Sequence, residues 1–227
     1  GLRNASAIFC QNNYQSDRIR SIFPDVKTFI IHIPYYHKTD LPKIKKHSER
    51  AYIAWIAIFQ HQKNLPALYE IVKKMPDIVF KIAGSNTNSG IGQTTQKALA
   101  RLRKCDNVEF VGYLKRTEVL PFLAQAYALL NTSHYEGFPC SYLDALSVGT
   151  PIVTVKKNDP DDFISKNCLG GVSDDYVGQK DLINQIVHDP NYSQLIERCR
   201  SYVSENHAPE VLSRQFIKNL EKIDKGN

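Results

Sequence analysis

The sequence predicts a doubly wound α/β fold built on a parallel sheet. From residue 51 onward, apolar runs of strand length alternate with segments whose apolar residues recur at helical spacing. The run 51–59 is apolar throughout, which is typical of a strand buried on both faces of a parallel sheet. Two later runs each end at a glycine, Gly84 and Gly112. Because ligands bind beyond the carboxyl ends of such strands, the loops after them should hold the informative residues.

We expect five strands in this sheet, over residues 51–59, 78–83, 108–111, 128–131 and 152–155. Helices are expected where apolar residues recur at helical spacing, over 65–75, 98–102, 119–126 and 141–148. Gly149 is well placed to end the last of these helices, with Pro151 just beyond it. The rest of the chain is expected to be mostly helical, ending in a helix over 209–223.

The segment before residue 51 is expected to lie outside the α/β domain. A short strand–helix–strand is expected over residues 1–33, from runs at 7–10, 16–23 and 28–33. Residues 34–50 are polar and basic and contain two prolines, which indicates a linker. The expected division is therefore 1–33, a linker over 34–50, a ligand-binding α/β domain over 51–205 and a C-terminal helix over 206–227.

Composition and charge exclude several classes of protein. The net charge is +6 and the pI about 9.0, which suits an anionic ligand or an acidic membrane surface. The basic residues are scattered, without a stripe interleaved with aromatics, so nucleic acid is disfavoured as a partner. The longest apolar run, 51–59, is about half of a membrane span, so we expect no transmembrane helix. The five cysteines show no metal-ligand spacing, which predicts a cytoplasmic protein with reduced thiols and no metal site.

One segment, residues 136–151, combines features that point to a binding site. Glu136 follows the fourth expected strand and lies in a loop at the mouth of the sheet. Gly137 would let the backbone come close to a ligand. Asp144 lies one turn into the following helix, where a carboxylate can accept two hydrogen bonds from a vicinal diol such as a ribose.

The start of that helix predicts an anion site. Pro139 lies where the helix would begin, a position that tolerates the loss of its amide. The amides near Phe138, Cys140 and Ser141 would then point outward at the positive end of the helix dipole, which is a phosphate-binding arrangement. Cys140 lies at this helix end, but no general base is placed there for nucleophile chemistry.

The segment resembles the E-x7-E signature of retaining glycosyltransferases of the GT-B fold, especially glycosyltransferase family 4. In that pattern Glu-Gly-Phe is followed by an acid eight residues after the first glutamate, then by Ala, and then by Gly-x-Pro. Here these are residues 136–138, 144–145 and 149–151, with Asp144 in place of the usual second glutamate. The resemblance covers residues 52 to about 202, and it implies that the α/β domain is the Rossmann-like donor lobe of a GT-B fold.

The resemblance implies roles for individual residues. Lys63, in the loop after the first strand of the domain, would grip the donor diphosphate. Glu136 would contact the hydroxyls of the donor sugar, and Asp144 the ribose, so Lys63 and Glu136 are the catalytic candidates. The further donor-binding candidates are Gly84, Tyr113, Leu114, Gly137, Phe138, Pro139, Cys140 and Ser141.

The activity implied is retaining transfer of a sugar from a nucleotide sugar, with UDP- and GDP-sugars favoured, to an acceptor glycan or glycolipid. No cofactor and no metal are expected. The family carries an acceptor-binding lobe of similar size upstream, so this chain would hold half of the active site and need that lobe or subunit as a partner. The expected location is cytoplasmic, and a peripheral contact with the inner face of the membrane stays open.

One departure leaves alternatives open. The family usually has Gly-Arg ahead of the lysine, and the arginine also faces the diphosphate; here these positions are Ala57 and Ile58. Lys115 and Arg116 are the candidates to replace that cation. The first alternative is a catalytically inactive or partner-dependent nucleotide-sugar-binding module, and the second is a sugar-nucleotide epimerase of the same fold. His134 is interpreted as a structural histidine in a tight loop rather than a catalytic base.

Overall fold

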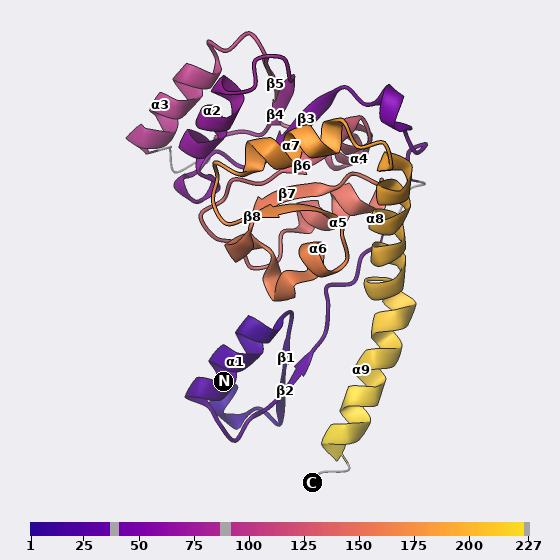
Figure 1. The fold of residues 1–227 in the computed structure, drawn as a ribbon. Coiled ribbons are helices and arrows are strands. Elements are labelled where there is room, and N and C mark those ends of the chain that lie inside the picture. Colours follow the sequence, from indigo (N-terminus) through magenta and orange to yellow (C-terminus); the bar gives the residue numbers. More distant parts are fainter. Residues whose placement is uncertain (37–40, 87–91, 225–227) are drawn as a thin grey trace. The chain divides into compact units, whose positions relative to one another are not determined.

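The computed structural model of the chain describes residues 1–36, 41–86 and 92–224. Within these ranges, six strands form one parallel sheet in the order β5-β4-β3-β6-β7-β8 (Figure 1). The strands are β3 (Tyr52–Ile56), β4 (Phe80–Ala83), β5 (Val108–Gly112), β6 (Ala126–Leu130), β7 (Ile152–Val155) and β8 (Gly170–Ser173). The doubly wound parallel sheet predicted from the sequence is therefore confirmed.

The chain builds this sheet outward in two directions from its middle. It runs from β3 through β4 to β5, crosses to β6, and continues through β7 to β8. The connecting helices are α2 (Leu65–Lys73), α3 (Gln93–Leu102), α4 (Arg116–Ala124), α5 (Cys140–Ser147) and α6 (Phe163–Lys166), and α7 (Gln179–Val187) and α8 (Tyr192–Asn206) follow β8. Because crossovers between parallel strands are right-handed, reversing the direction of growth moves the helices to the other face. Accordingly, α2 packs on α3, and α4 packs on α5.

The central strands are buried on both faces. Side chains of Ile53, Ala54, Ile152 and Val153 have no exposed surface, as continuous apolar runs predict. One buried arginine, Arg50, donates to the carbonyl oxygens of residues 148 and 149, where the helix α5 ends, and to that of Ala126 at the start of β6. These bonds satisfy carbonyl groups that have no partner within the helix.

Several expected boundaries were wrong. The described chain beyond residue 155 is mostly helical, as predicted, but the sequence missed β8, which pairs with β7 over residues 152–155. Ala126 was expected to belong to a helix, but it is the first residue of β6. The strand expected over 51–59 ends at Ile56, and the strand expected over 28–33 is β2 (Lys27–Ile30). The ends of these strands are set by pairing with neighbouring strands and not by the local apolar pattern.

The chain divides into two compact units, residues 40–200 and residues 1–39 together with 201–227. The second unit holds β1 (Ala7–Cys10) and β2, which pair in parallel, with α1 (Asn13–Ile22) between them, and α9 (Pro209–Asp224). Inside it, the rings of Phe9 and Phe216 lie 4.8 Å apart. Residues 37–40 of the expected linker and 225–227 of the expected C-terminal helix lie outside the described residues.

Candidate functional site

Two loops meet where the strand order of the sheet reverses. The β3 loop, residues 57–64, follows β3, and the β6 loop, residues 131–139, follows the neighbouring strand β6. Connections on either side of this point leave toward opposite faces of the sheet, which opens a crevice at the carboxyl ends of the strands. The site candidates Lys63 and Glu136 lie on these two loops.

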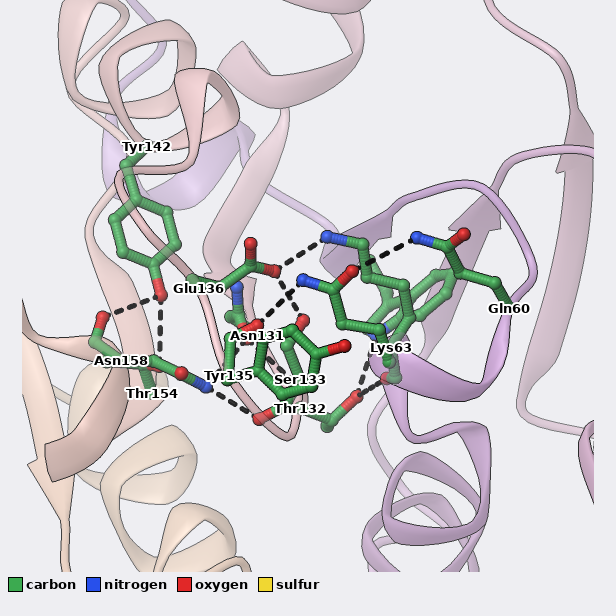
Figure 2. A network of polar contacts seen from close by, with 12 residues as sticks. Gln60, Lys63, Asn131, Thr132, Ser133, Tyr135, Glu136, Tyr142, Thr154 and Asn158 are labelled. Atoms are coloured by element: carbon green, nitrogen blue, oxygen red, sulfur yellow. Dashed lines mark hydrogen bonds and ion pairs between the residues drawn. The ribbon is translucent and has the colours of Figure 1, made fainter. Parts of the chain in front are cut away.

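Lys63 and Glu136 form an ion pair across the two loops (Figure 2). The Nζ of Lys63 donates to Oε1 of Glu136 at 2.7 Å, and the Oγ of Ser133 donates to the same oxygen at 2.6 Å. The side chains of Lys63 and Glu136 are only 20% and 9% exposed. A carboxylate buried to this degree is stable because its charge is both paired and hydrogen-bonded.

Backbone and side-chain bonds hold the two loops against each other. The amide of His134 donates to the carbonyl oxygen of Gln62 at 2.7 Å, and Nε2 of Gln62 donates to the carbonyl oxygen of Tyr135 at 2.8 Å. The hydroxyl of Thr132 donates to the carbonyl oxygen of Lys63 at 2.8 Å. These bonds fix the backbone beside Lys63 and beside Glu136, so the two loops hold both members of the ion pair in place.

A second layer supports the β6 loop from β7. Nδ2 of Asn158 donates to the carbonyl oxygen of Ser133 at 2.6 Å. The hydroxyl of Tyr142 donates to Oγ1 of Thr154 at 3.0 Å and to the carbonyl oxygen of Asn158 at 3.3 Å (Figure 2). Burial raises the pKa of the Tyr142 hydroxyl, so it remains a neutral donor. Ser133 is thereby held where it can donate to Glu136.

The helix α5 begins beside this pair, as the sequence predicted. Pro139 is its N-cap residue, and Cys140 is its first helical residue and is exposed. A cavity of about 20 Å³ is lined by Ser141 together with both members of the ion pair. The positive end of the α5 dipole therefore lies next to Lys63. The ring of Phe138 packs 5.3 Å from that of Phe163, which anchors the chain entering the helix.

The two glycine candidates differ in why they are glycine. A Cβ at Gly84 would lie 2.0 Å from the carbonyl oxygen of Ala57, so the approach of two backbones already requires glycine there. A Cβ at Gly137 would meet no described atom within 4 Å, and Gly137 is exposed. Packing among the described residues therefore does not explain Gly137, which suits its expected role beside a ligand.

The loop after β5 is open to solvent. Gly112 ends the strand with a φ of +82°, which turns the chain outward. Tyr113 is 74% exposed and Leu114 is half-buried. Both are accessible to a ligand at the carboxyl edge of the sheet, and their expected contact with a nucleotide base stays a prediction.

Asp144 is held by a partner that the sequence did not assign to it. Oδ2 of Asp144 accepts from Nη1 of Arg116 at 2.6 Å, and Oδ1 accepts from Nη2 at 2.8 Å. The carboxylate of Asp144 is 6% exposed, whereas the side chain of Arg116 is 62% exposed. Asp144 does not line the cavity beside Lys63, so the site has two separate ion pairs.

Two histidines and one isoleucine also lie on these two loops. The rings of His61 and His134 lie 4.9 Å apart, and burial, His61 and Lys157 lower the pKa of His134. His134 therefore favours its neutral form. The side chain of Ile58 is 53% exposed, so it does not fill a packed pocket.

Sequence reasoning missed Ser133, Gln62 and Asn158 as supporting residues, and it named Arg116 only as a substitute cation. Polar residues directly after the carboxyl end of a buried strand were the available signal for Ser133. Nothing in the local pattern marks Gln62 or Asn158, because both act through backbone groups of another loop.

Two features are absent from the described ranges of the chain. No helix in the described part of the chain is long and apolar enough to cross a membrane. Among residues 1–36, 41–86 and 92–224, no group of three or more His, Cys, Asp or Glu side chains could hold a metal ion.

Comparison with known proteins shows the family. The family model of the glycosyl transferases group 1 matches residues 37–206, and the chain belongs to this family. Among curated relatives, the poly(glycerol-phosphate) alpha-glucosyltransferase of Bacillus subtilis (strain 168) is 24% identical over 234 residues, which cover 100% of this chain and 32% of the relative.

Solved structures of similar fold include two bound to UDP. A variant of S. aureus TarM, in complex with fondaparinux, alpha-GlcNAc-glycerol and UDP, has a TM-score of 0.77 at 21% identity, covering 96% of this chain and 45% of that chain. Anabaena HepE, in complex with UDP and glucose, has a TM-score of 0.75 at 13% identity, covering 96% of this chain and 64% of that chain. The α/β unit thus has the Rossmann-like fold of GT-B glycosyltransferases, and the chain spans about a third of the curated relative.

Proposed function

We propose that this chain is the donor-binding lobe of a retaining GT-B glycosyltransferase of the family 4 type, which transfers a sugar from a nucleoside diphosphate to an acceptor glycan or glycolipid. The Lys63–Glu136 ion pair carries this proposal. It places a cation and a carboxylate 2.7 Å apart at the switch point of the sheet, beside the N-terminus of α5. A cation and helix amides suit a diphosphate, and a carboxylate suits sugar hydroxyls.

In the proposed mechanism the ion pair exchanges partners when the donor binds. Lys63 turns from Glu136 to the diphosphate, which the N-terminus of α5 also faces. Glu136 accepts hydrogen bonds from the sugar hydroxyls in place of its bond from Lys63. When the glycosidic bond to the diphosphate breaks, negative charge develops on the departing phosphate oxygen, and the fixed positive groups stabilise it. Asp144 takes the ribose hydroxyls.

The relatives support a UDP-sugar donor and an α-linked product. TarM and HepE are both solved with UDP. The Bacillus subtilis relative is named an alpha-glucosyltransferase, and its name gives poly(glycerol-phosphate) as acceptor. An α-linked product made from a donor of α configuration is the outcome of retention. The GDP-sugar stays the second donor candidate, and the cytoplasmic location stays a prediction from the sequence.

The acceptor is proposed to bind outside this chain. The chain covers 45% of the TarM chain and 64% of the HepE chain, so a large part of those proteins has no counterpart here. We therefore propose that the acceptor-binding lobe lies elsewhere in the protein or in a partner. An inactive module is not favoured, because the paired Lys63 and Glu136 of the transferase signature are both present and held together.

A binding and turnover experiment tests the proposal. The chain is titrated with UDP, GDP, UDP-glucose and GDP-mannose by calorimetry, and donor hydrolysis is followed alongside. We expect binding of one nucleotide series, with little turnover, and loss of binding in Lys63→Ala. No measurable binding of any of the four ligands would refute the donor-lobe proposal. Rapid acceptor-dependent transfer by this chain alone would refute the proposal that it holds half of the active site.

A further inference from the structure

Arg116 is not explained by the stability of the helix on which it lies. It is the first residue of α4, a helix of nine residues. A positive charge in the first turn opposes the helix dipole and is unfavourable by roughly 0.3–1 kcal/mol. The guanidinium instead makes two short hydrogen bonds, at 2.6 and 2.8 Å, to the two oxygens of Asp144. The reason for Arg116 is therefore to be sought at Asp144.

The two partners are buried to very different degrees. Asp144 keeps 6% of its side-chain surface exposed, and Arg116 keeps 62%. A buried carboxylate needs paired charge and hydrogen bonds, and a planar guanidinium supplies both in one fixed orientation. Arg116, the more exposed partner, thus sets the direction in which the Asp144 carboxylate faces.

Binding by a bidentate arginine does not use the whole acceptor capacity of a carboxylate. An ionised carboxylate has about four lone-pair sites, and a bidentate arginine takes one on each oxygen. A carboxylate held by an arginine in this way can still accept hydrogen bonds from hydroxyl groups. Orientation matters more here than in the family pattern, because aspartate is shorter than glutamate by one methylene, about 1.5 Å. A shorter side chain reaches less far and has less freedom to adjust.

We propose that Arg116 is a positioning residue that holds Asp144 so that its carboxylate accepts the ribose hydroxyls of the donor nucleotide. This rests on the proposed function, which assigns the ribose to Asp144. Arg116 acts through Asp144 and not by direct contact with the diphosphate. The replacement of the missing phosphate-facing arginine at position 58 is therefore not its role.

The test separates ribose from phosphate. UDP and GDP, and their 2′,3′-dideoxy forms, are titrated into the wild-type chain, Arg116→Ala and Arg116→Lys by calorimetry. Arg116→Lys keeps the positive charge but not the bidentate geometry, so it remains informative if Arg116→Ala fails to fold. Arg103→Ala is the matched control. Arg103 is an exposed arginine that lies before β5 in the chain and packs on the ring of Phe110.

We expect Arg116→Ala and Arg116→Lys each to bind the ribonucleotide about tenfold more weakly, the size of one charge-assisted hydrogen bond. Binding of the dideoxy form should not change, because it lacks the hydroxyls that Asp144 accepts. Equal weakening for both forms would overturn the inference and indicate a direct phosphate contact. Tighter binding in the variants would also overturn it, since Arg116 would then obstruct the site. If the wild-type chain binds neither UDP nor GDP, the proposed function fails and takes the inference with it.

Discussion

Replacing Glu136 by alanine should separate the binding of a free nucleotide from the binding of a nucleotide sugar. Oε1 of Glu136 accepts from Lys63 Nζ at 2.7 Å and from Ser133 Oγ at 2.6 Å. At 2.7 Å the charges attract by about 6 kcal/mol with an effective dielectric constant of about 20. Desolvation of the two partly buried groups cancels most of this, which leaves a net contribution of about 1–3 kcal/mol.

This net attraction competes with a diphosphate for Lys63. In Glu136→Ala the lysine is released, so free UDP should bind as tightly as to wild type or tighter, by up to about 1–2 kcal/mol. UDP-glucose gains the same released lysine but loses the acceptor for its sugar hydroxyls. The preference for UDP-glucose over UDP should therefore fall by about 1.5–3 kcal/mol, the range for hydrogen bonds to a charged group.

Calorimetry with both ligands on both proteins measures this difference directly, and GDP with GDP-mannose repeats it for the second donor series. Glu109→Ala is the matched control, because Glu109 also pairs with a lysine, Lys81, at 2.8 Å, on β5 and β4. It should change neither affinity. If Glu136→Ala weakens UDP and UDP-glucose by the same amount, Glu136 does not discriminate the sugar and its assigned role is wrong.

Three further predictions concern single sites. Ile58→Arg should fold, because Ile58 is 53% exposed. It should tighten UDP binding by about 1–2 kcal/mol, and the affinity should depend more strongly on salt. Unchanged affinity would show that position 58 does not face the diphosphate. Gly149→Ala should lower the free energy of unfolding by about 1–3 kcal/mol, since φ is +71° and the new Cβ would lie 2.5 Å from Cγ2 of Ile196; an unchanged melting temperature would contradict this. Burial lowers the pKa of His207 from 6.5 to about 4, so as the pH falls the unfolded chain takes up a proton there before the folded chain does. The free energy of unfolding should therefore fall by up to about 3 kcal/mol as the pH drops from 6.5 toward 4. His207→Gln should lose that part of the pH dependence in denaturant titrations, and an identical profile would exclude His207 as its source.

Those parts of the fold that follow from burial could be predicted from sequence. Residues 52–56 of the run 51–59 are apolar because β3 lies in the middle of the sheet, although the run continues beyond the end of the strand into the β3 loop. β8 could not be predicted in this way. Two of its residues are Gly170 and Gly171, which have low strand propensity. At Gly170 a Cβ would lie 1.9 Å from the carbonyl oxygen of Ile152, so close pairing with β7 selects glycine.

The site was predictable in its parts and not in its pairings. Loops after neighbouring parallel strands must meet, so Lys63 and Glu136 could be expected at one edge of the sheet although 73 residues separate them. Which donor would satisfy Asp144 could not be expected, because helical periodicity gives the face of each helix and not the rotation of α4 against α5. The bond between Arg116 and Asp144 depends on that rotation.

Under the proposed function, the Lys63–Glu136 pair gives a physical reason for a nucleotide sugar to bind more tightly than the free nucleoside diphosphate. Within the pair each charge already satisfies the other, at 20% and 9% side-chain exposure. A free nucleoside diphosphate can use the lysine only by leaving Glu136 with the hydroxyl of Ser133 and no charge partner, and a buried carboxylate without a charge partner is costly. A nucleotide sugar replaces the lost bond at Glu136 with its own hydroxyls. Loss of the sugar therefore restores the competition for Lys63, and in the proposed cycle this competition drives release of the nucleoside diphosphate once transfer is complete.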